Sequence, residues 1–181
     1  GNETLVLSLQ NPTGGNLGTQ TTTTLNIADN DSPGFTIVES GGTTQVDESG
    51  TTDTFTVVLN TQPLSDVELA IATTSKTKSK VADEATLTPT TLTFNKTNWD
   101  QAQTVTVTGV DDDLDDGDQT TTVTISVVDA NSDDAFDNLK NQTVTVTTID
   151  DDTAGITLTP SNGSTAVTEG GNTDSYTVVL D

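Results

Sequence analysis

An acidic triplet that recurs together with its surroundings is the feature of this sequence that most constrains its fold. Asp29-Asn30-Asp31 precedes an apolar run, and Asp150-Asp151-Asp152 precedes a similar run 121 residues later. At the same spacing, residues 55–59 read Phe-Thr-Val-Val-Leu and residues 176–180 read Tyr-Thr-Val-Val-Leu. Self-similarity at a fixed spacing is the sequence signature of a repeat protein. The sequence therefore predicts tandem repeats with carboxylates at the boundary between one repeat and the next.

A second internal match sets the boundaries of these repeats. Residues 1–4 resemble residues 117–120, and an alternating run follows each of them. We therefore predict that 1–31 is the C-terminal part of one repeat, 32–152 is a complete repeat and 153–181 is the N-terminal part of the next. On this interpretation the chain is a window cut from a longer tandem array.

Polar and apolar residues alternate with a period of two along most of the chain. Val105 and Val107 share one face of the run 103–108, and Phe55, Val57 and Leu59 share one face of the run 55–59. The runs 120–128 and 143–148 follow the same pattern. Such alternation is typical of antiparallel sheets with one buried and one solvated face. Turn residues separate the runs, and about seven short strands in about 120 residues is the count typical of a β-sandwich. We expect an all-β protein made of tandem immunoglobulin-like antiparallel sandwiches.

The charge and composition exclude several functions. The 181 residues carry 28 acidic and 5 basic side chains, for a net charge of −23. Binding to nucleic acid or to an anionic membrane surface needs clustered basic residues, so neither partner is expected. No run of about 20 apolar residues exists, so no insertion into a membrane is expected. Self-repulsion at this charge opposes compaction unless cations neutralise it.

The residues needed for most catalytic chemistry are missing. The sequence contains no Cys and no His, which removes thiolate nucleophiles and imidazole acid–base catalysis. Paired carboxylates can hydrolyse glycosides, but that needs an apolar cleft rich in aromatic residues, and aromatic residues make up 3% of the chain. We therefore expect that the protein is not an enzyme and that it has no catalytic residues.

Several motifs resemble the Calx-beta repeat. They are the run Leu92-Thr93-Phe94, the strand 103–107, the acidic loop 110–118 and the closing run 144–152. The resemblance covers nearly the whole chain and implies an immunoglobulin-like β-sandwich. The family occurs in the calcium sensors of sodium–calcium exchangers, in integrin β4 and in large bacterial surface proteins. The Thr-rich, Arg-free composition is most similar to the bacterial surface and adhesion proteins.

The acidic loop favours calcium as a ligand. Asp occupies six of the eight positions 111–118, and such crowding of carboxylates costs repulsion that a bound cation would relieve. Calcium takes six to eight oxygen ligands in a flexible geometry, whereas magnesium needs a stricter octahedron. The simpler interpretation of the same loop is a solvated acidic surface that keeps the chain soluble. A second acidic group lies in one hairpin loop and is interpreted as a solvated tip, with a further ion site as the alternative; its members are Asp129, Asp133, Asp134 and Asp137.

The resemblance implies which residues form the calcium site. It brings the acidic loop, the terminal triplet and an early Glu to the same end of the sandwich. The residues implied for the complete repeat are Glu48, Asp111, Asp112, Asp113, Asp115, Asp116, Asp150, Asp151 and Asp152. The corresponding residues of the partial repeats are Glu3, Asp29, Asp31 and Glu169. Asp83 or Glu84 could supply a further acid.

Together these observations favour a structural role outside the cell. We expect a calcium-binding repeat of a long bacterial fibre, adhesin or surface layer, at the cell surface or beyond it, stiffened by Ca²⁺ at the boundaries between repeats. Its partners would be neighbouring repeats of the same chain. Three alternatives stay open: an adhesive module that binds a glycan or a host protein, a self-assembling filament subunit, and a calcium sensor domain.

Overall fold

The chain folds almost entirely into β-strands in the computed structural model, which describes residues 2–74 and 84–180. Three short 3₁₀ turns, Ser40–Gly42, Asp129–Asn131 and Ser161–Gly163, are the helical elements of the described residues. The strands are β1 (Glu3–Ser8), β2 (Thr22–Ile27), β3 (Phe35–Glu39), β4 (Thr44–Asp47), β5 (Thr52–Leu59), β6 (Val67–Thr74), β7 (Ala85–Thr88), β8 (Thr91–Phe94), β9 (Gln103–Gly109), β10 (Gln119–Val127), β11 (Gln142–Ile149), β12 (Ile156–Pro160) and β13 (Tyr176–Leu180).

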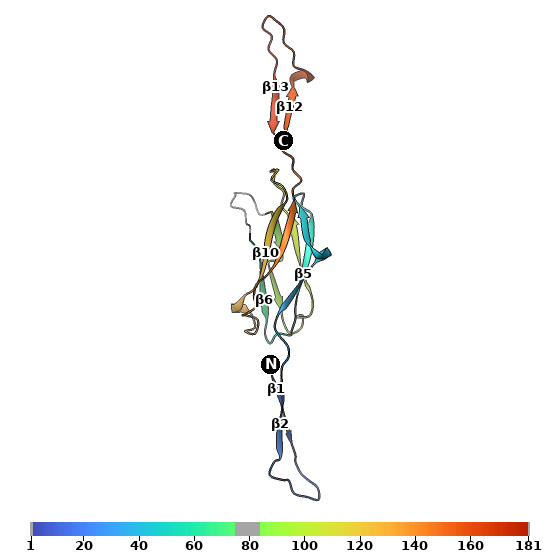
Figure 1. Cartoon of the computed structure of the whole chain (residues 1–181), viewed down its shortest axis with the longest axis vertical. Helices are drawn as coiled ribbons and strands as arrows, with labels where there is room; N and C mark the ends of the chain where they lie inside the picture. Colours follow the sequence, from blue (N-terminus) through green and yellow to red (C-terminus); the bar gives the residue numbers. More distant parts are fainter. Residues whose placement is uncertain (1, 75–83, 181) are drawn as a thin grey trace.

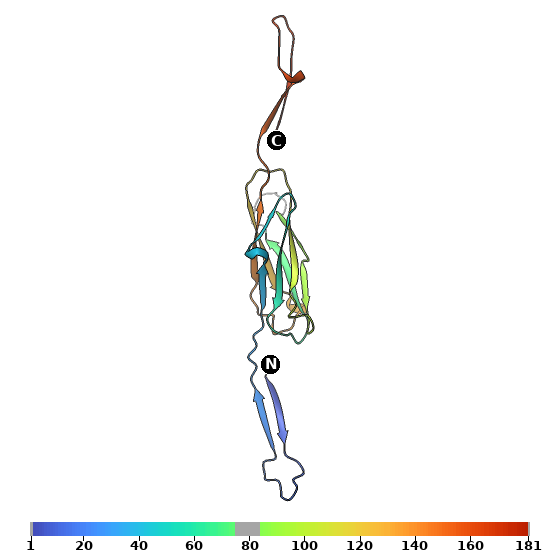
Figure 2. The same ribbon diagram turned by 90° about the vertical axis from the view of Figure 1, so that its right-hand side faces the viewer.

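Strands β3 to β11 form one β-sandwich of two sheets (Figures 1 and 2). One sheet has the order β4-β11-β10-β6-β8 and the other has the order β3-β5-β9-β7. The pairing between β4 and β11 is parallel, and the other recorded strand pairs are antiparallel. This is an all-β sandwich of immunoglobulin-like type. It has more strands than the sequence pattern indicates, because β4, β7 and β8 are only four residues long, which is too short for a period of two to stand out in the sequence.

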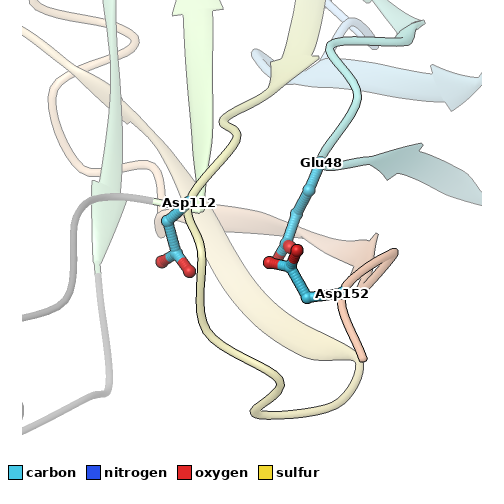
Figure 3. Close-up of side chains that lie close together, drawn as sticks. All are labelled: Glu48, Asp112 and Asp152. Carbon is cyan, nitrogen blue, oxygen red and sulfur yellow. The ribbon is translucent and has the colours of Figure 1, made fainter. Parts of the chain in front are cut away.

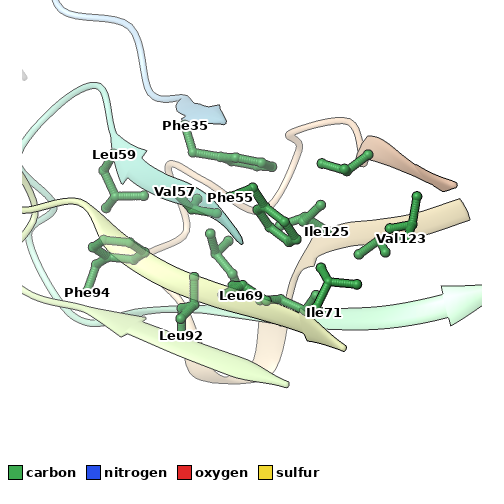
Figure 4. Close-up of a cluster of buried hydrophobic side chains, with 14 of the residues drawn as sticks. Phe35, Phe55, Val57, Leu59, Leu69, Ile71, Leu92, Phe94, Val123 and Ile125 are labelled. Carbon is green, nitrogen blue, oxygen red and sulfur yellow. The ribbon is translucent and has the colours of Figure 1, made fainter. Parts of the chain in front are cut away.

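Alternate residues of both sheets meet in one hydrophobic core (Figure 4). The predicted inward row of β5 is confirmed, since Phe55, Val57 and Leu59 are all buried. The largest apolar side chains that are almost completely buried are Phe55, Phe94, Phe136, Leu69 and Ile125. Each buried side chain of this size contributes roughly 1.5–3 kcal/mol to folding through removal of apolar surface from water. One sandwich core therefore holds the part of the chain between β3 and β11 together.

The loop between β10 and β11 is only in part the solvated tip that the sequence suggests, because Asp129 and Asp134 are exposed whereas other residues of the loop are buried. Phe136 is buried in the core, and Asp133 is 7% exposed. The Asp133 carboxylate accepts hydrogen bonds from the backbone N–H groups of Leu64, Ser65 and Ala135. Three backbone donors compensate the charge for its burial and hold the pKa of Asp133 below its usual range, although burial itself acts in the opposite direction. The interpretation of Asp133 as a surface acid was therefore wrong.

Two separate hairpins extend from opposite ends of the sandwich (Figures 1 and 2). One consists of β1 and β2 and the other of β12 and β13, and every residue of β1, β2 and β13 is exposed. Each hairpin is a two-stranded sheet on its own. No helix in the described parts of the chain is long and apolar enough to cross a membrane. The division of the chain into repeats stays a prediction from the sequence.

We predict that truncating equivalent aromatic residues in the sandwich and in a hairpin has very different effects. Phe55 is 1% exposed, whereas Tyr176, the matching residue of the sequence repeat, is 59% exposed. Phe55→Ala should lower the free energy of unfolding by about 3–5 kcal/mol, because it leaves a large core cavity. Tyr176→Ala should leave the main unfolding transition unchanged. Urea unfolding followed by circular dichroism measures both variants, and equal losses would mean that β13 shares the sandwich core.

Candidate metal centre

Glu48 is a carboxylate buried at one end of the sandwich. It directly follows β4, and its backbone N–H donates to the Ile149 carbonyl across the parallel pairing of β4 with β11, at 3.1 Å. The side chain is 0% exposed, and neither of its carboxylate oxygens has a hydrogen-bond partner. An isolated buried charge is strongly unfavourable unless it is neutralised or paired. Glu48 is therefore the residue whose environment most needs an explanation.

Two aspartates meet Glu48 at this end of the sandwich (Figure 3). Asp112 comes from the loop between β9 and β10, and Asp152 comes from the segment that follows β11. One carboxylate oxygen from each of the three residues lies within 4.8 Å of the other two. Two oxygens that bind the same Ca²⁺ at about 2.4 Å can be no more than about 4.8 Å apart, so this spacing fits one shared ion. An oxygen of Asp152 is also buried without a hydrogen-bond partner.

The backbone at the start of the acidic loop is held against the end of β4, directly before Glu48. A side chain at Gly109 would place its Cβ 2.0 Å from the Asp47 carbonyl oxygen, so the two backbones approach too closely for any other residue. Gly109 N–H donates to Thr51 at 3.1 Å, and Val110 N–H donates to the Glu84 carbonyl at 3.1 Å. These contacts fix where the acidic loop leaves β9, directly beside Glu48.

Hydrogen bonds also tie the acidic loop to the segment that leads to β12. The Asp150 carboxylate accepts from the Gly117 and Asp152 N–H groups. The Asp115 carboxylate accepts from the Ala154 N–H at 2.7 Å. The segment after β11 is therefore attached to the sandwich at several points. Its carboxylates can act together with those of the loop.

The acidic surroundings change the protonation of the buried carboxylates. The pKa of Glu48 is raised from 4.5 to about 7, first by burial and then by the charges of Asp150, Asp112, Glu84 and Asp116. Burial also raises the pKa of Asp152, with further increases from its acidic neighbours. Both shifts have the same two causes: burial disfavours the charged form of the carboxylate, and the neighbouring negative charges disfavour it further. A bound cation would reverse this effect.

The structure brings together part of the predicted set of ligands. Glu48, Asp112 and Asp152 form the cluster, and Asp150 and Asp116 lie close enough to raise the pKa of Glu48. Asp111, Asp113 and Asp151 raise the pKa of Asp152 without joining the cluster. Asp115 instead bonds to the backbone at Ala154. Glu84 is buried beside Glu48, as the sequence suggested for either Asp83 or Glu84, while Asp83 lies outside the described residues.

The residues predicted for the partial repeats lie elsewhere. Glu3, Asp29 and Asp31 line a cleft of about 270 Å³ at the opposite end of the sandwich, together with Asp133. Glu169 is exposed near the tip of the β12–β13 hairpin. Among the described residues, the cluster around Glu48 is the group of three or more acids whose ligand atoms converge. Sequence similarity alone does not separate Glu48 from Glu169, because burial depends on the surrounding strands.

No protein-family model matches this chain, and no curated protein sequence is significantly similar to it. Several solved structures are similar in fold. A Salmonella enterica SafA pilin in complex with the SafB chaperone matches 71% of this chain and 60% of that chain, with 19% identity and a TM-score of 0.46. A chaperone–tip adhesin complex of CFA/I fimbriae matches 70% of this chain and 60% of that chain, with 10% identity and a TM-score of 0.44.

An apo-form Calx CBD1 domain is also similar. It matches 65% of this chain and 98% of that domain, with 16% identity and a TM-score of 0.41. This chain therefore spans about 60% of the fimbrial chains and nearly all of the Calx domain. At these identities and scores the likenesses support no particular activity or partner, and the assignment to the Calx-beta family is not shown.

We predict that removing the Glu48 charge changes how stability depends on pH. The folded chain holds the Glu48 proton up to pH about 7, whereas the unfolded chain releases it near 4.5. The contribution of Glu48 to stability therefore falls as the pH rises through this window. In excess chelator, Glu48→Gln should match the wild type near pH 4.5 and be more stable than it at about pH 8. Thermal unfolding across this range measures the difference.

Glu169→Gln is the matched control, because Glu169 occupies the corresponding position of the sequence repeat but is exposed. Its stability should follow that of the wild type at every pH. If the stability of Glu48→Gln also follows that of the wild type at every pH, the charged form of the Glu48 carboxylate is not destabilising in the folded chain, and the argument from its burial is wrong.

Proposed function

We propose that this chain is a calcium-binding structural module in which Ca²⁺ binds between Glu48, Asp112 and Asp152. The observation that carries the proposal is the fully buried Glu48 carboxylate, which has no hydrogen-bond partner and faces two further carboxylates. If the acidic residues at this end of the sandwich only conferred solubility, there would be no reason for one of them to be buried without a hydrogen-bond partner. A divalent cation would neutralise the three charges and supply the missing partner.

The chemistry of the cluster favours calcium over other metal ions. All three convergent groups are carboxylates, and the chain contains no Cys or His that would favour zinc. Calcium accepts six to eight oxygens at irregular angles, including backbone carbonyls and water. The nearby Asp150 and Asp116 could complete its coordination. Magnesium needs a regular octahedron and retains its waters, which suits an irregular loop site less well.

The position of the site suggests a mechanical role. Its three carboxylates come from three different segments: the end of β4, the loop between β9 and β10, and the segment that leads to β12. An ion held by all three would fasten that segment to the end of the sandwich, in addition to the hydrogen bonds at Asp115 and Asp150. Without the ion, repulsion between the carboxylates would loosen the joint.

We place this module in a long fibre, adhesin or surface layer outside the cell. Support comes from the resemblance to Calx-beta repeats, the net charge of −23 and the internal repeat of the sequence. Extracellular calcium-binding modules typically have dissociation constants of about 10⁻⁴ to 10⁻³ M, so external calcium would occupy such a site. The partners of the module would be the neighbouring repeats. The proposed output is stiffness of the chain.

We predict a calcium-specific increase in thermal stability. At about a hundredfold excess over the dissociation constant, one bound ion adds about 2.7 kcal/mol, which corresponds to a rise in Tm of about 8–12 °C for the β3–β11 sandwich. Asp112→Asn and Asp152→Asn should each remove most of this rise. Asp31→Asn should leave it intact, because Asp31 occupies the repeat position of Asp152 at the other end of the sandwich. Equal shifts with magnesium, or no shift, would contradict the proposal.

We also predict that calcium narrows the range of positions of the β12–β13 hairpin relative to the sandwich. The chain has no cysteine, so two cysteines introduced at the exposed positions Thr104 and Thr159 can be spin-labelled specifically. Pulsed electron paramagnetic resonance should give a narrow distance distribution in calcium and a broader one in chelator. Asp152→Asn should give the broad distribution under both conditions. A width that does not depend on calcium would leave binding possible but would contradict the stiffening role.

A further inference from the structure

The β1–β2 hairpin carries an apolar face that nothing in the described chain covers. The antiparallel register places Leu5 opposite Leu25 and Glu3 opposite Ile27, so these side chains share one face with Leu7. Leu9 continues the same alternation beyond the end of β1. All five of these apolar residues are exposed, with Leu7 at 52%. The opposite face carries mostly Thr, Ser and Asn. Such one-sided patterning belongs to a sheet that packs on another layer.

The β12–β13 hairpin carries a second face of the same kind. Its register pairs Ile156 with Leu180 and Leu158 with Val178. These four residues and Tyr176 share one face and are all exposed, with Val178 at 56%. The two uncovered faces lie on hairpins at opposite ends of the molecule (Figures 1 and 2). One copy of the chain therefore cannot bring its own two faces together.

Each hairpin reproduces one half of the sandwich core. The pair Glu3–Ile27 occupies the repeat positions of the pair Gln119–Thr148 in β10 and β11. The pair Ile156–Leu180 likewise occupies the positions of Phe35–Leu59 in β3 and β5. Sequence similarity and strand register thus agree. The first hairpin corresponds to β10–β11 and the second to β3–β5.

These two halves face each other in the sandwich. β10 and β11 belong to the five-stranded sheet, and β3 and β5 belong to the four-stranded sheet. In the core, Phe35 and Phe55 from one sheet lie toward Val123 and Ile125 from the other (Figure 4). The apolar face of β12–β13 corresponds to the inner face of β3–β5, so we expect it to pack on a face like the inner face of β10–β11. The β1–β2 hairpin presents that type of face.

The β12–β13 hairpin already has the local structure of its counterpart. The Asp174 carboxylate accepts hydrogen bonds from the Ser161 hydroxyl and the Ala166 N–H. Asp53 accepts the equivalent bonds from Ser40 and Gln45 in the sandwich. The hairpin is thus organised before any partner covers it, which lowers the entropy cost of docking.

We propose that the apolar face of β12–β13 in one copy of this 181-residue chain packs on the apolar face of β1–β2 in a second copy. The contact is head to tail, so a dimer still has one free face at each of its two ends and association continues into linear chains. A junction lacks counterparts of β6 to β9, so we expect a weak and reversible contact. The proposal uses neither Glu48 nor calcium and does not depend on the proposed function.

The first test measures mass against concentration. Sedimentation velocity of the full chain, in about 0.15 M salt to screen its negative charge, should show growth beyond 18.7 kDa as the concentration rises toward about 1 mM. Leu7→Glu or Val178→Glu should each abolish this growth. Val6→Glu and Val179→Glu are matched controls, because they introduce the same charge at the neighbouring residue on the opposite face. Both controls should associate like the wild type.

A mixing experiment identifies which face binds which. Leu7→Glu keeps an intact β12–β13 face, and Val178→Glu keeps an intact β1–β2 face. Each variant alone should stay monomeric, while an equimolar mixture should form a one-to-one complex that does not grow further. The unfolding transition of the sandwich reports that both variants are folded, since neither residue contributes to its core.

Three results would overturn the proposal. If the wild type stays monomeric up to about 1 mM, the hairpin faces take another occupant, such as further strands of a longer chain. If both single variants still dimerise alone, like faces pair with like. If the controls lose association together with the core-facing variants, the growth is non-specific.

Discussion

The parallel pairing of β4 with β11 is the constraint on which the rest of this structure depends. Because the two strands are parallel, both end at the same end of the sandwich. The hydrogen bond from the Glu48 N–H to the Ile149 carbonyl extends their pairing by one residue. This brings Glu48 beside the segment that begins at Asp150. The close approach of Gly109 to Asp47 brings the acidic loop to the same end. Three distant parts of the sequence therefore place carboxylates in one small volume.

That convergence opposes folding unless the charge is compensated. The chain carries a net charge of −23, and Glu48 is removed from water without a hydrogen-bond partner. Asp133, at the other end of the sandwich, shows how a buried carboxylate is usually stabilised: three backbone N–H groups donate hydrogen bonds to it and compensate its charge. Glu48 has no such donors. The chain can resolve this by keeping a proton on Glu48 or by binding a cation, and only the second solution predicts stabilisation by calcium.

Much of the fold follows from the alternation of residues, but the site follows only in part. The pattern in 55–59 and 120–128 predicts strands and their buried faces correctly, because burial of one face of a sheet imposes a period of two. The acidic loop is equally visible. The sequence does not show which of the carboxylates in this loop converge, because that depends on how β4, β9 and β11 finish at the same end of the sandwich. Only Asp112 of that loop joins the cluster.

Two other features show the same limit. Glu48 and Glu169 occupy matching positions, yet only Glu48 is buried, because the strands that would enclose Glu169 are not part of its hairpin. Asp133 looks like a surface acid, since loops with several Asp residues are usually solvated. The apolar Phe136 within that loop was the signal that the segment folds back onto the core. A large aromatic residue in an acidic loop therefore argues against a solvated tip.

The central claim is that a cation compensates the buried Glu48 carboxylate. Crystals of the full chain grown in calcium, with anomalous diffraction to locate the ion, test it most directly. The account predicts one anomalous peak about 2.3–2.6 Å from carboxylate oxygens of Glu48, Asp112 and Asp152. A structure without that peak, in which a protonated Glu48 shares a short hydrogen bond with Asp152 at the same calcium concentration, would contradict it.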